Sequence, residues 1–495
     1  MDQQVPLRAK PPKQRKDREY RESNIGSESH LKDIKDFYDV IVIGSGLAGL
    51  TSANCMARQG YSVLLLEQHY ILGGLAQYFK RRGHIFDISL HGFPIGMKKT
   101  LRKYWSKELA DNIVQVKSVR FDNPQFTLDT TFTREDFTRI IVEKFGILEE
   151  TVISFYDHLA KMNFYDNDTM TTRELFQMYF PDRKDVWRLL MEPISYANGS
   201  TLDEPAISYG IVFSNFMSKG VYIYEGGTDD MIDKMEKILI ENGVDVRTKC
   251  LVQKVHIENG RTTGVTVNNK LIKTDCVISN AGLHPTINKL AGRENFPEEI
   301  IKELDDVKVN SSSCQVYIGI DKEEEFPFIG DLIFTSTYPE YDSDALTSMD
   351  ITSRTYSVYY PEMRPERNRY TIVASINANY DDWANLSDEE YQIAKDKMID
   401  ETIESLEKYI PGIREKIHYL EAATPRTVEF YTLSHKGTSF GTKFNGLKIS
   451  QAIPENINGL YHAGSVGIIM SGWLGAANYG VIVSNSADKY LCSIR

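Results

Sequence analysis

The sequence predicts an α/β fold with two domains, each built from separated segments of the chain. Three glycine-rich patterns predict it: one follows a short apolar run at residues 40–43, one lies near residue 226, and one lies near the C-terminus. The long segments between them have the mixed composition of a separate domain. A chain of 495 residues is long enough to form two cores.

Composition and charge limit the classes of function that this protein can have. The hydrophobic fraction is 41% and the charged fraction 25%, as in ordinary globular proteins. A net charge of −12 argues against nucleic acid as a partner, because binding to phosphates needs a basic surface. The five cysteines are scattered without metal-ligand spacing, which is typical of reduced thiols and predicts a cytoplasmic setting.

Residues 1–36 form a tail that is rich in Lys and Arg near its start and has no apolar segment of a secretory signal. The composition predicts a disordered, solvated tail. The alternative is contact with an anionic membrane surface.

The first structural unit that the sequence predicts is a βαβ unit. Residues 40–43 are a β-branched run typical of a buried parallel strand, and the sequence Gly44-x-Gly46-x-x-Gly49 then opens a helix. In this pattern Gly44 allows a tight turn, Gly46 lets backbone N–H groups approach a pyrophosphate, and Gly49 lets helix and strand pack closely. The unit therefore predicts a Rossmann-like dinucleotide site.

The second strand of this unit, residues 62–66, ends at Glu67, where an acid can hydrogen-bond an adenosine ribose. Gly73-Gly74 and then Phe86-Asp87 follow at fixed spacing. This arrangement resembles the flavoprotein superfamily of amine oxidases and carotenoid desaturases. The resemblance implies FAD, with the Gly73-Gly74 loop at its pyrophosphate and the loop after Asp87 beside the isoalloxazine ring.

The second block begins at Gly226-Gly227, which precede an amphipathic helix, and continues in strands separated by turns at residues 242–243 and 259–260. It resembles the branch of carotenoid desaturases, carotenoid isomerases and retinol saturases. In that branch Leu251 and Val252 present backbone to the adenine, and a strand like residues 275–280 returns to the FAD domain.

The third block includes Thr424-Pro425 and the sequence Gly437-x-x-x-Gly441, which resemble a pattern near the exit of the family's substrate domain. Residues 459–464 resemble its last flavin-binding strand. A helix expected from residues 475–477 would direct its positive end toward the flavin pyrimidine.

Two positions depart from the common pattern of the superfamily. Ser465 stands where many members have a ribitol-binding Asp, and His91 stands in a loop where other members have a different sequence. The retinol saturase branch also has a histidine at the position of His91, so the two departures favour a resemblance to that branch.

The resemblance thus implies FAD-binding residues in all three blocks. They are Gly44, Ser45, Gly46, Leu47, Ala48, Gly49, Glu67, Gln68, Gly73, Gly74, Leu75, Ala76, Leu251, Val252, Asn280, Gly464, Ser465, Gly475 and Ala476.

Because these blocks are separated, we expect residues 37–95, 220–290 and 440–495 to form a discontinuous FAD-binding domain. Residues 96–219 and 291–439 are then an α+β substrate-binding domain, with strand-like runs at residues 314–321, 355–360 and 370–378. Ser387 with Glu390 is a capping box that predicts a helix extending to about residue 410.

A flavin carries hydride chemistry itself, so the protein needs mainly to orient the substrate and tune the ring. His91 is the candidate catalytic residue, as a proton donor or a hydrogen bond near the flavin; the alternative is a structural histidine. Phe213, Phe216, Tyr224 and Trp473 are candidates for lining an apolar tunnel, and ordinary core packing is the alternative. Glu225 is either an acid facing the site or a surface acid.

The resemblance implies an FAD-dependent oxidoreductase that desaturates, saturates or isomerises carbon–carbon bonds of a long polyene, isoprenoid or unsaturated lipid. Such an apolar small molecule implies peripheral contact with a membrane. Two alternatives remain open: an amine oxidase of the same superfamily, and a prenyl-binding protein of the GDP-dissociation-inhibitor type that lacks flavin.

Residues 463–485 contain no charged side chain. About 20 apolar residues can span a bilayer, but a spanning helix here would contain five glycines, which are poor helix formers. We therefore expect these residues to pack against the flavin and the sheet rather than to anchor the protein.

Overall fold

The predicted βαβ unit is present in the computed structural model, which describes residues 27–88, 92–162, 169–217, 219–364, 369–467 and 469–495. Strand β1 (Phe37–Ile43) leads into helix α2 (Leu47–Arg58), and β2 (Val63–Leu66) returns beside β1. The two strands are parallel, with Val40 opposite Val63. Of the predicted tail, residues 1–36, residues 1–26 lie outside the described residues. Residues 27–36 are not a solvated tail, because they include the short helix η1 (Glu28–Leu31) and because Leu31 and Ile34 are buried in the core.

These strands belong to a seven-stranded sheet, called sheet one, with the order β10-β2-β1-β13-β12-β11 and β19 paired to β13. Its parallel part joins β10, β2, β1, β13 and β19, and its antiparallel part is the meander β11-β12-β13. The predicted turn at Asn259-Gly260 is confirmed, since both residues have positive φ. The remaining strands of sheet one are β10 (Asp245–Arg247), β11 (Val252–Glu258), β12 (Arg261–Val267), β13 (Lys270–Ser279) and β19 (Leu460–His462).

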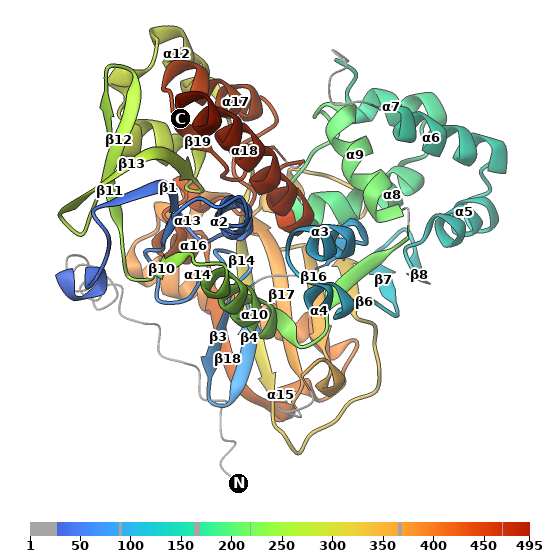
Figure 1. The fold of residues 1–495 in the computed structure, drawn as a ribbon. Helices are drawn as coiled ribbons and strands as arrows, with labels where there is room; N and C mark the ends of the chain where they lie inside the picture. The colour runs from blue at the N-terminus through green and yellow to red at the C-terminus, as the bar shows by residue number, and fades with distance from the viewer. Residues whose placement is uncertain (1–26, 89–91, 163–168, 218, 365–368, 468) are drawn as a thin grey trace.

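Helices enclose sheet one (Figure 1). The C-terminal helix α18 packs on α2 so closely that a Cβ added to Gly480 would lie 2.4 Å from the carbonyl oxygen of Ala48. Ser52 Oγ donates to the carbonyl of Gly480 at 3.1 Å across the same contact. The helices around this sheet are α3 (Gly96–Tyr104), α4 (Lys107–Asp111), α10 (Gly227–Glu241), α12 (Glu298–Asp306), α17 (Gly446–Asn456) and α18 (Gly472–Ile494).

A second seven-stranded sheet, sheet two, has the order β18-β14-β17-β16-β15-β7-β8. Its pairs are antiparallel except for β15 with β7. The three strand-like runs of the sequence are confirmed as β14, β16 and β17. The strands are β7 (Val119–Asp122), β8 (Thr127–Thr130), β14 (Ser312–Ile320), β15 (Leu332–Ser336), β16 (Ser353–Tyr359), β17 (Thr371–Ala378) and β18 (Ile417–Ala423).

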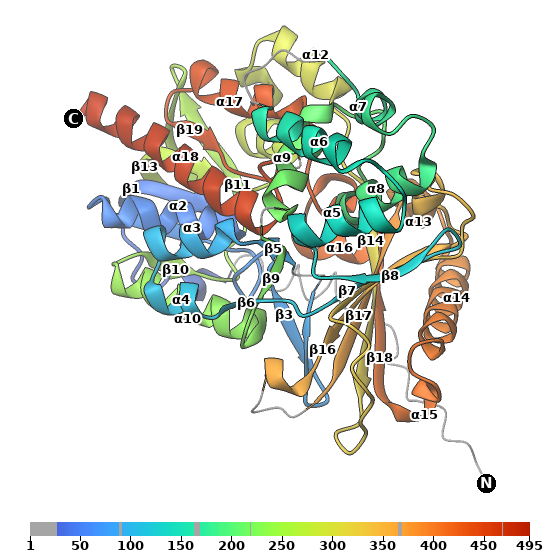
Figure 2. The same ribbon diagram turned by 90° about the vertical axis from the view of Figure 1, so that its right-hand side faces the viewer.

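Helix α14 (Asp388–Glu407) covers one face of sheet two (Figure 2). Its buried residues, among them Met398 and Ile403, pack with alternate apolar residues of the sheet such as Val316 and Ile372. The predicted capping box is present: Glu390 N donates to Ser387 Oγ, and Ser387 N donates to Glu390 Oε2. The helix ends a few residues before the predicted position.

The opposite face of sheet two is covered by a helical lobe, whose core is aromatic and aliphatic. The lobe is shown in teal and green in Figure 1. It comprises α5 (Arg134–Glu143), α6 (Glu149–Lys161), α7 (Thr172–Tyr179), α8 (Lys184–Asn198) and α9 (Ala206–Met217). Two small sheets complete the fold: the hairpin of β3 (Tyr78–Arg81) and β4 (His84–Asp87), and the sheet of β5 (Phe93–Pro94), β9 (Val221–Tyr224) and β6 (Ile113–Gln115).

Short helices connect these parts. They are η1 (Glu28–Leu31), α11 (Leu283–Pro285), η2 (Thr286–Ala291), η3 (Arg293–Asn295), η4 (Ala345–Thr347), η5 (Pro361–Met363), α13 (Tyr380–Ala384), α15 (Ile413–Lys416), α16 (Pro425–Thr432) and η6 (His435–Gly437).

The uncharged stretch at residues 463–485 is not one helix. It begins after β19, passes through a loop, and enters α18 only at Gly472. No helix within the described ranges has both the length and the apolar composition needed to cross a bilayer.

Candidate functional site

A cavity of about 1450 Å³, called the main cavity, is lined by residues of both sheets and of the helical lobe. Single-ligand pockets are commonly about 300–1,000 Å³, so this space is large enough for two ligands side by side. It opens at the carboxyl ends of β1, β2 and β13, the edge where parallel α/β sheets bind ligands.

The turn between β1 and α2 forms one end of the main cavity. Gly44 has φ of +89°, a conformation that favours glycine. A Cβ on Gly49 would lie 2.1 Å from the carbonyl oxygen of Gly44, so a side chain there would displace the turn. The N–H groups of the first turn of α2 have no partner within the helix, and together with the helix dipole they form an anion site.

Two more segments close around this turn. A Cβ on Gly74 would lie 2.9 Å from the Cα of Gly46, and Gly73 forms an isolated bridge with Gly46. On the other side, Asn280 at the end of β13 lies so close that a Cβ on Gly46 would be 2.6 Å from its Oδ1. Glycine at positions 46 and 74 therefore permits the close approach of the two backbone segments and of the Asn280 side chain.

Glu67 lies at the carboxyl end of β2 and is 7% exposed. Its Oε2 accepts hydrogen bonds from Ser45 N (2.8 Å) and Ser45 Oγ (2.6 Å), and its Oε1 accepts from His69 N (2.7 Å). Burial raises the pKa of Glu67, and these hydrogen bonds oppose the rise. Because a carboxylate accepts about four hydrogen bonds, capacity remains for a ribose hydroxyl.

A buried hydrogen-bond chain fixes the third segment. His462, the last residue of β19, bonds through Nε2 to the carbonyl of Ala281 (2.9 Å) and through Nδ1 to Ser450 Oγ (2.7 Å). Ser450 also bonds to the hydroxyl of Tyr479 on α18 (2.6 Å). Burial lowers the pKa of His462 to about 4, so the ring is neutral and donates to Ala281. The chain joins α17, β19, α18 and the loop after β13.

The start of α18 forms another part of the wall of the main cavity. The helix begins at Gly472, one turn earlier than predicted, so that Gly475 lies within its first turn. A Cβ on Gly475 would lie 2.3 Å from the carbonyl of Ile469, which explains the glycine. Trp473 lines the main cavity and also stacks on Phe93 with ring centroids 5.0 Å apart, so it serves both the wall and the core.

Sequence reasoning missed a buried ion pair that joins two of the motifs. Arg364 Nη2 lies 2.5 Å from Oδ1 of Asp87, and its Nε lies 3.0 Å from Oδ1 of Asp229. Asp87 also accepts from Thr228 at the start of α10. Arg364 therefore joins the Phe86-Asp87 motif to the Gly226-Gly227 motif, and a Cβ on Gly227 would overlap its guanidinium. No sequence pattern singles out this arginine.

Most of the residues expected to bind cofactor line the main cavity; only Gly49 and Gly464 lie behind its wall. Gly464 packs there against the carbonyl of Ala281. His91 lies outside the described residues, so its role stays a prediction. Its nearest described neighbours along the chain, Ile88 and Gly92, line the cavity.

The four candidate tunnel residues separate into two pairs. Phe216 and Trp473 line the main cavity. Phe213 does not, because it is fully buried in the lobe and stacks on Tyr209 at 5.0 Å. Tyr224 also packs in the core, where its hydroxyl accepts from Asn112 (3.1 Å) and donates to Asp230 (3.2 Å). For these two the expectation of a tunnel position was wrong, and the core alternative holds.

Glu225 is exposed and is absent from the cavity wall, as the surface alternative expected. The apolar wall is formed instead by Phe132, Ile194, Ile211, Val212, Leu332 and Phe334. These positions carry no motif, and only the fold brings them together.

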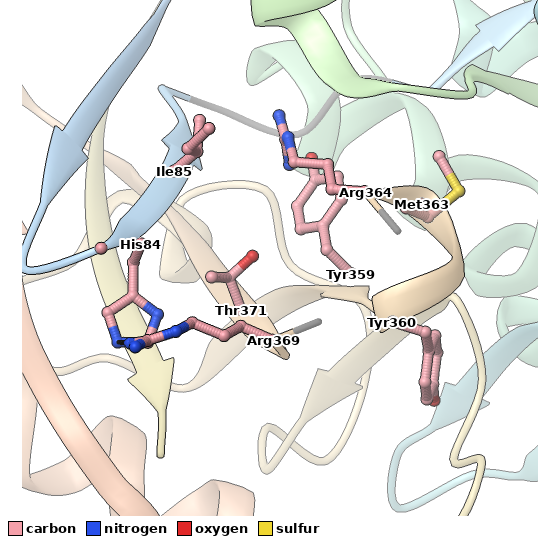
Figure 3. A pocket seen from close by; sticks show the side chains of 9 residues that line it. His84, Ile85, Tyr359, Tyr360, Met363, Arg364, Arg369 and Thr371 are labelled. Carbon is pink, nitrogen blue, oxygen red and sulfur yellow. Dashed lines mark hydrogen bonds between the residues drawn. The ribbon is translucent and has the colours of Figure 1, made fainter. Parts of the chain in front are cut away.

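A second pocket, of about 10 Å³, lies beside β4 (Figure 3). His84 Nε2 lies 3.2 Å from Arg369 Nη1 and 3.0 Å from His418 Nδ1. Burial, with Arg369 and His418, lowers the pKa of His84 to about 4. The pocket holds about one water molecule and is too small for a substrate. Among the described residues, no group of three His, Cys, Asp or Glu side chains could hold a metal ion.

Comparisons with known proteins agree with this geometry. The family model described as flavin containing amine oxidoreductase matches residues 47–413. The chloroplastic prolycopene isomerase of Daucus carota is 26% identical over 90% of this chain and 79% of that protein. The all-trans-retinol 13,14-reductase of Danio rerio is 23% identical over 81% of this chain and 77% of that protein.

Among solved structures, an oxidoreductase from Methanosarcina mazei has the same fold, with a TM-score of 0.63 and 17% identity over 90% of this chain and 99% of that one.

Proposed function

The chain belongs to the flavin containing amine oxidoreductase family, and on this basis we propose that it binds FAD and acts on carbon–carbon bonds of a long apolar polyene, isoprenoid or unsaturated lipid. The reaction is a desaturation, a saturation or an isomerisation without net redox change. The observation that carries the proposal is the main cavity, in which a dinucleotide cradle continues into an apolar space.

The residues present fit FAD. The N-terminus of α2 would hold the pyrophosphate, Glu67 the adenosine ribose, and the backbone of Leu251 and Val252 the adenine, since all of these line the same cavity. The loop at Gly73-Gly74 would lie at the pyrophosphate, and the first turn of α18 would flank the ring. FAD, when bound, supplies hydride transfer to and from carbon.

The chain's own residues orient the substrate and exclude water. The start of α18 directs its positive end into the cavity, where it favours negative charge. Phe216 and Trp473 present aromatic surface toward an apolar chain. We propose that His91, which stands between Ile88 and Gly92 in the sequence, donates a proton or a hydrogen bond there.

The fold supports a division into an FAD domain around sheet one and a substrate domain around sheet two. Sheet one takes its strands from residues 37–66, 245–279 and 460–462. Sheet two takes its strands from residues 119–130 and 312–423, which lie between these segments.

An apolar substrate partitions into membranes, so we also propose peripheral contact with a membrane surface from the cytoplasm. Ile482 and Tyr431 both line the main cavity and are 46% and 41% exposed, which places apolar surface where the cavity meets solvent. The double variant Ile482→Asp/Tyr431→Asp is expected to lower flotation with lipid vesicles. An Ile153→Asp variant, on an exposed apolar residue away from the cavity, is the control.

The central test is an absorption spectrum after reconstitution with FAD, followed by anaerobic incubation with polyene, isoprenoid, unsaturated-lipid and amine substrates. Products are analysed for gain or loss of two hydrogens, or for an isomer of unchanged mass. We expect flavin absorption and turnover of an apolar polyene or lipid. A colourless protein would contradict the cofactor proposal, and turnover of amines alone would identify an amine oxidase.

A further inference from the structure

Much of the β14, β16 and β17 part of the sheet-two face that lines the main cavity is polar, whereas Leu332 and Phe334 of β15 belong to the apolar wall. The polar side chains that line the cavity there include Ser313 and Gln315 of β14, Ser375 and Asn377 of β17, and Thr355 of β16. We call this set the polar floor. The apolar wall of the helical lobe lies across the same cavity, with Ile194 and Phe216 among its residues.

The strand sequences carry a period-two alternation that produces this floor. In β14, Ser313 and Gln315 alternate with Cys314 and Val316, which pack in the core beneath α14. In an antiparallel sheet such alternation ordinarily places the polar face in water. Here the helical lobe covers that face, and Gln315 is only 4% exposed.

Strand register makes the floor continuous. Gln315 is directly opposite Ser375, and Ser375 is directly opposite Thr355. Ser375 Oγ donates to Gln315 Oε1 at 2.6 Å, and Gln315 Nε2 donates to Ser313 Oγ at 3.3 Å. The side chains thus form a fixed row of neutral hydrogen-bonding groups.

The amide of Gln315 has capacity beyond these two bonds, because a primary amide offers two donors and an acceptor with two lone pairs. A pure hydrocarbon would cover the floor without offering any partner, which costs free energy for every polar group that it removes from water. A ligand that carries oxygen at this position would replace the lost water contacts.

The polar floor also restricts the charge of the oxygen-containing group that it can bind. Its members are neutral amides and hydroxyls. The acid at its β18 edge, Glu421, accepts from the hydroxyl of Tyr419 at 2.6 Å and lies 3.8 Å from Nε of Arg81. Neither a carboxylate nor an ammonium group meets an opposite charge on the floor itself.

We propose that the substrate carries a neutral oxygen function, a hydroxyl or a carbonyl, and that Gln315 binds it together with Ser313 and Ser375. This rests on the proposed function, since it specifies which apolar polyene or lipid the main cavity accepts. Hydrocarbons without oxygen are then poor ligands, although they share the apolar chain.

The test is equilibrium binding of C20 and C30 polyenes, each as a set that shares one carbon skeleton and ends in methyl, hydroxymethyl, aldehyde or carboxylate. Binding is measured by quenching of tryptophan fluorescence with the full chain, before and after loading with FAD. We expect the alcohol or the aldehyde to bind about tenfold more tightly than the hydrocarbon and the carboxylate. A difference of this size is what one or two hydrogen bonds to the polar floor contribute.

The nearly isosteric Gln315→Met variant should abolish this preference while the hydrocarbon binds as before. Ser375→Ala, a smaller change, should reduce it and serves if Gln315→Met does not fold. Cys314→Ala, next along β14 but packed beneath α14, is the matched control and should retain the preference.

Equal binding of hydrocarbon and alcohol would overturn the proposal. So would tightest binding of the carboxylate, absence of binding by every member of both sets, or an unchanged preference in both floor variants. Failure of the proposed function appears separately, as a protein that does not take up FAD or does not turn over any polyene or lipid.

Discussion

Replacing Arg364 by methionine would remove the cation that holds two buried acids. Arg364 is 9% exposed, and its partners Asp87 and Asp229 are 2% and 16% exposed. Burial works to lower the pKa of Arg364, but the two acids outweigh it and hold the pKa above its ordinary value. The variant leaves Asp87 as an uncompensated buried charge, which costs about 3–5 kcal/mol.

For a chain of 495 residues this loss corresponds to a decrease of about 3–5 °C in melting temperature, because the unfolding entropy is about 2 cal/mol/K per residue. Calorimetry measures it. The double variant Arg364→Met/Asp87→Asn should recover much of the loss, since the neutral amide no longer needs a cation.

Arg139 provides the matched control. It also contacts two acids, Asp136 at 2.6 Å and Glu143 at 3.2 Å, but it is 54% exposed. Arg139→Met should therefore cost no more than about 1 kcal/mol. The reasoning would be refuted if the two arginine variants lost similar stability, or if the double variant were no more stable than Arg364→Met.

Two further predictions concern the cofactor end of the main cavity. Gly49→Ala should weaken FAD binding about tenfold or more, because its Cβ would displace the carbonyl of Gly44. The control is Gly282→Ala, whose Cβ would only touch Pro285 at 3.4 Å and which should retain the flavin after desalting; equal retention of flavin by both variants would contradict the packing argument. The pKa of His462 is lowered from 6.5 to about 4 in the folded protein, so the unfolded chain takes up this proton more readily. As the pH falls from 6.5 toward 4, the free energy of unfolding therefore decreases, by about 3 kcal/mol in total for this residue. Urea unfolding should show a shallower decline over this range for His462→Gln, and an identical pH slope would argue against a buried neutral ring.

The sequence predicted those parts of the fold that depend on local rules. The glycine turn at Gly44 requires positive φ, the capping box at Ser387 depends on residues three apart, and the acid Glu67 ends its strand at a fixed distance from the turn. Each is set by neighbours along the chain, so one sequence is enough to recognise it.

The substrate side was harder to predict because it depends on packing between distant segments. Phe213 and Phe216 lie in one helix and look alike in the sequence, yet only Phe216 reaches the cavity. The alternation in β14 was visible, but its polar face reads as solvent-exposed until the helical lobe is seen to cover it. Arg364 acquires its role only when Asp87 and Asp229 are brought to it.

The position of β19 and α18 has a consequence for biosynthesis. β19 pairs in parallel with β13 across about 180 residues of sequence, and α18 closes on α2 from the far end of the chain. Contacts of such high sequence separation form late in folding. The cradle at α2 is made early during translation, but the wall formed by β19 and α18 emerges only after residue 460 has been added. A chain truncated before β19 would therefore be unable to retain its flavin.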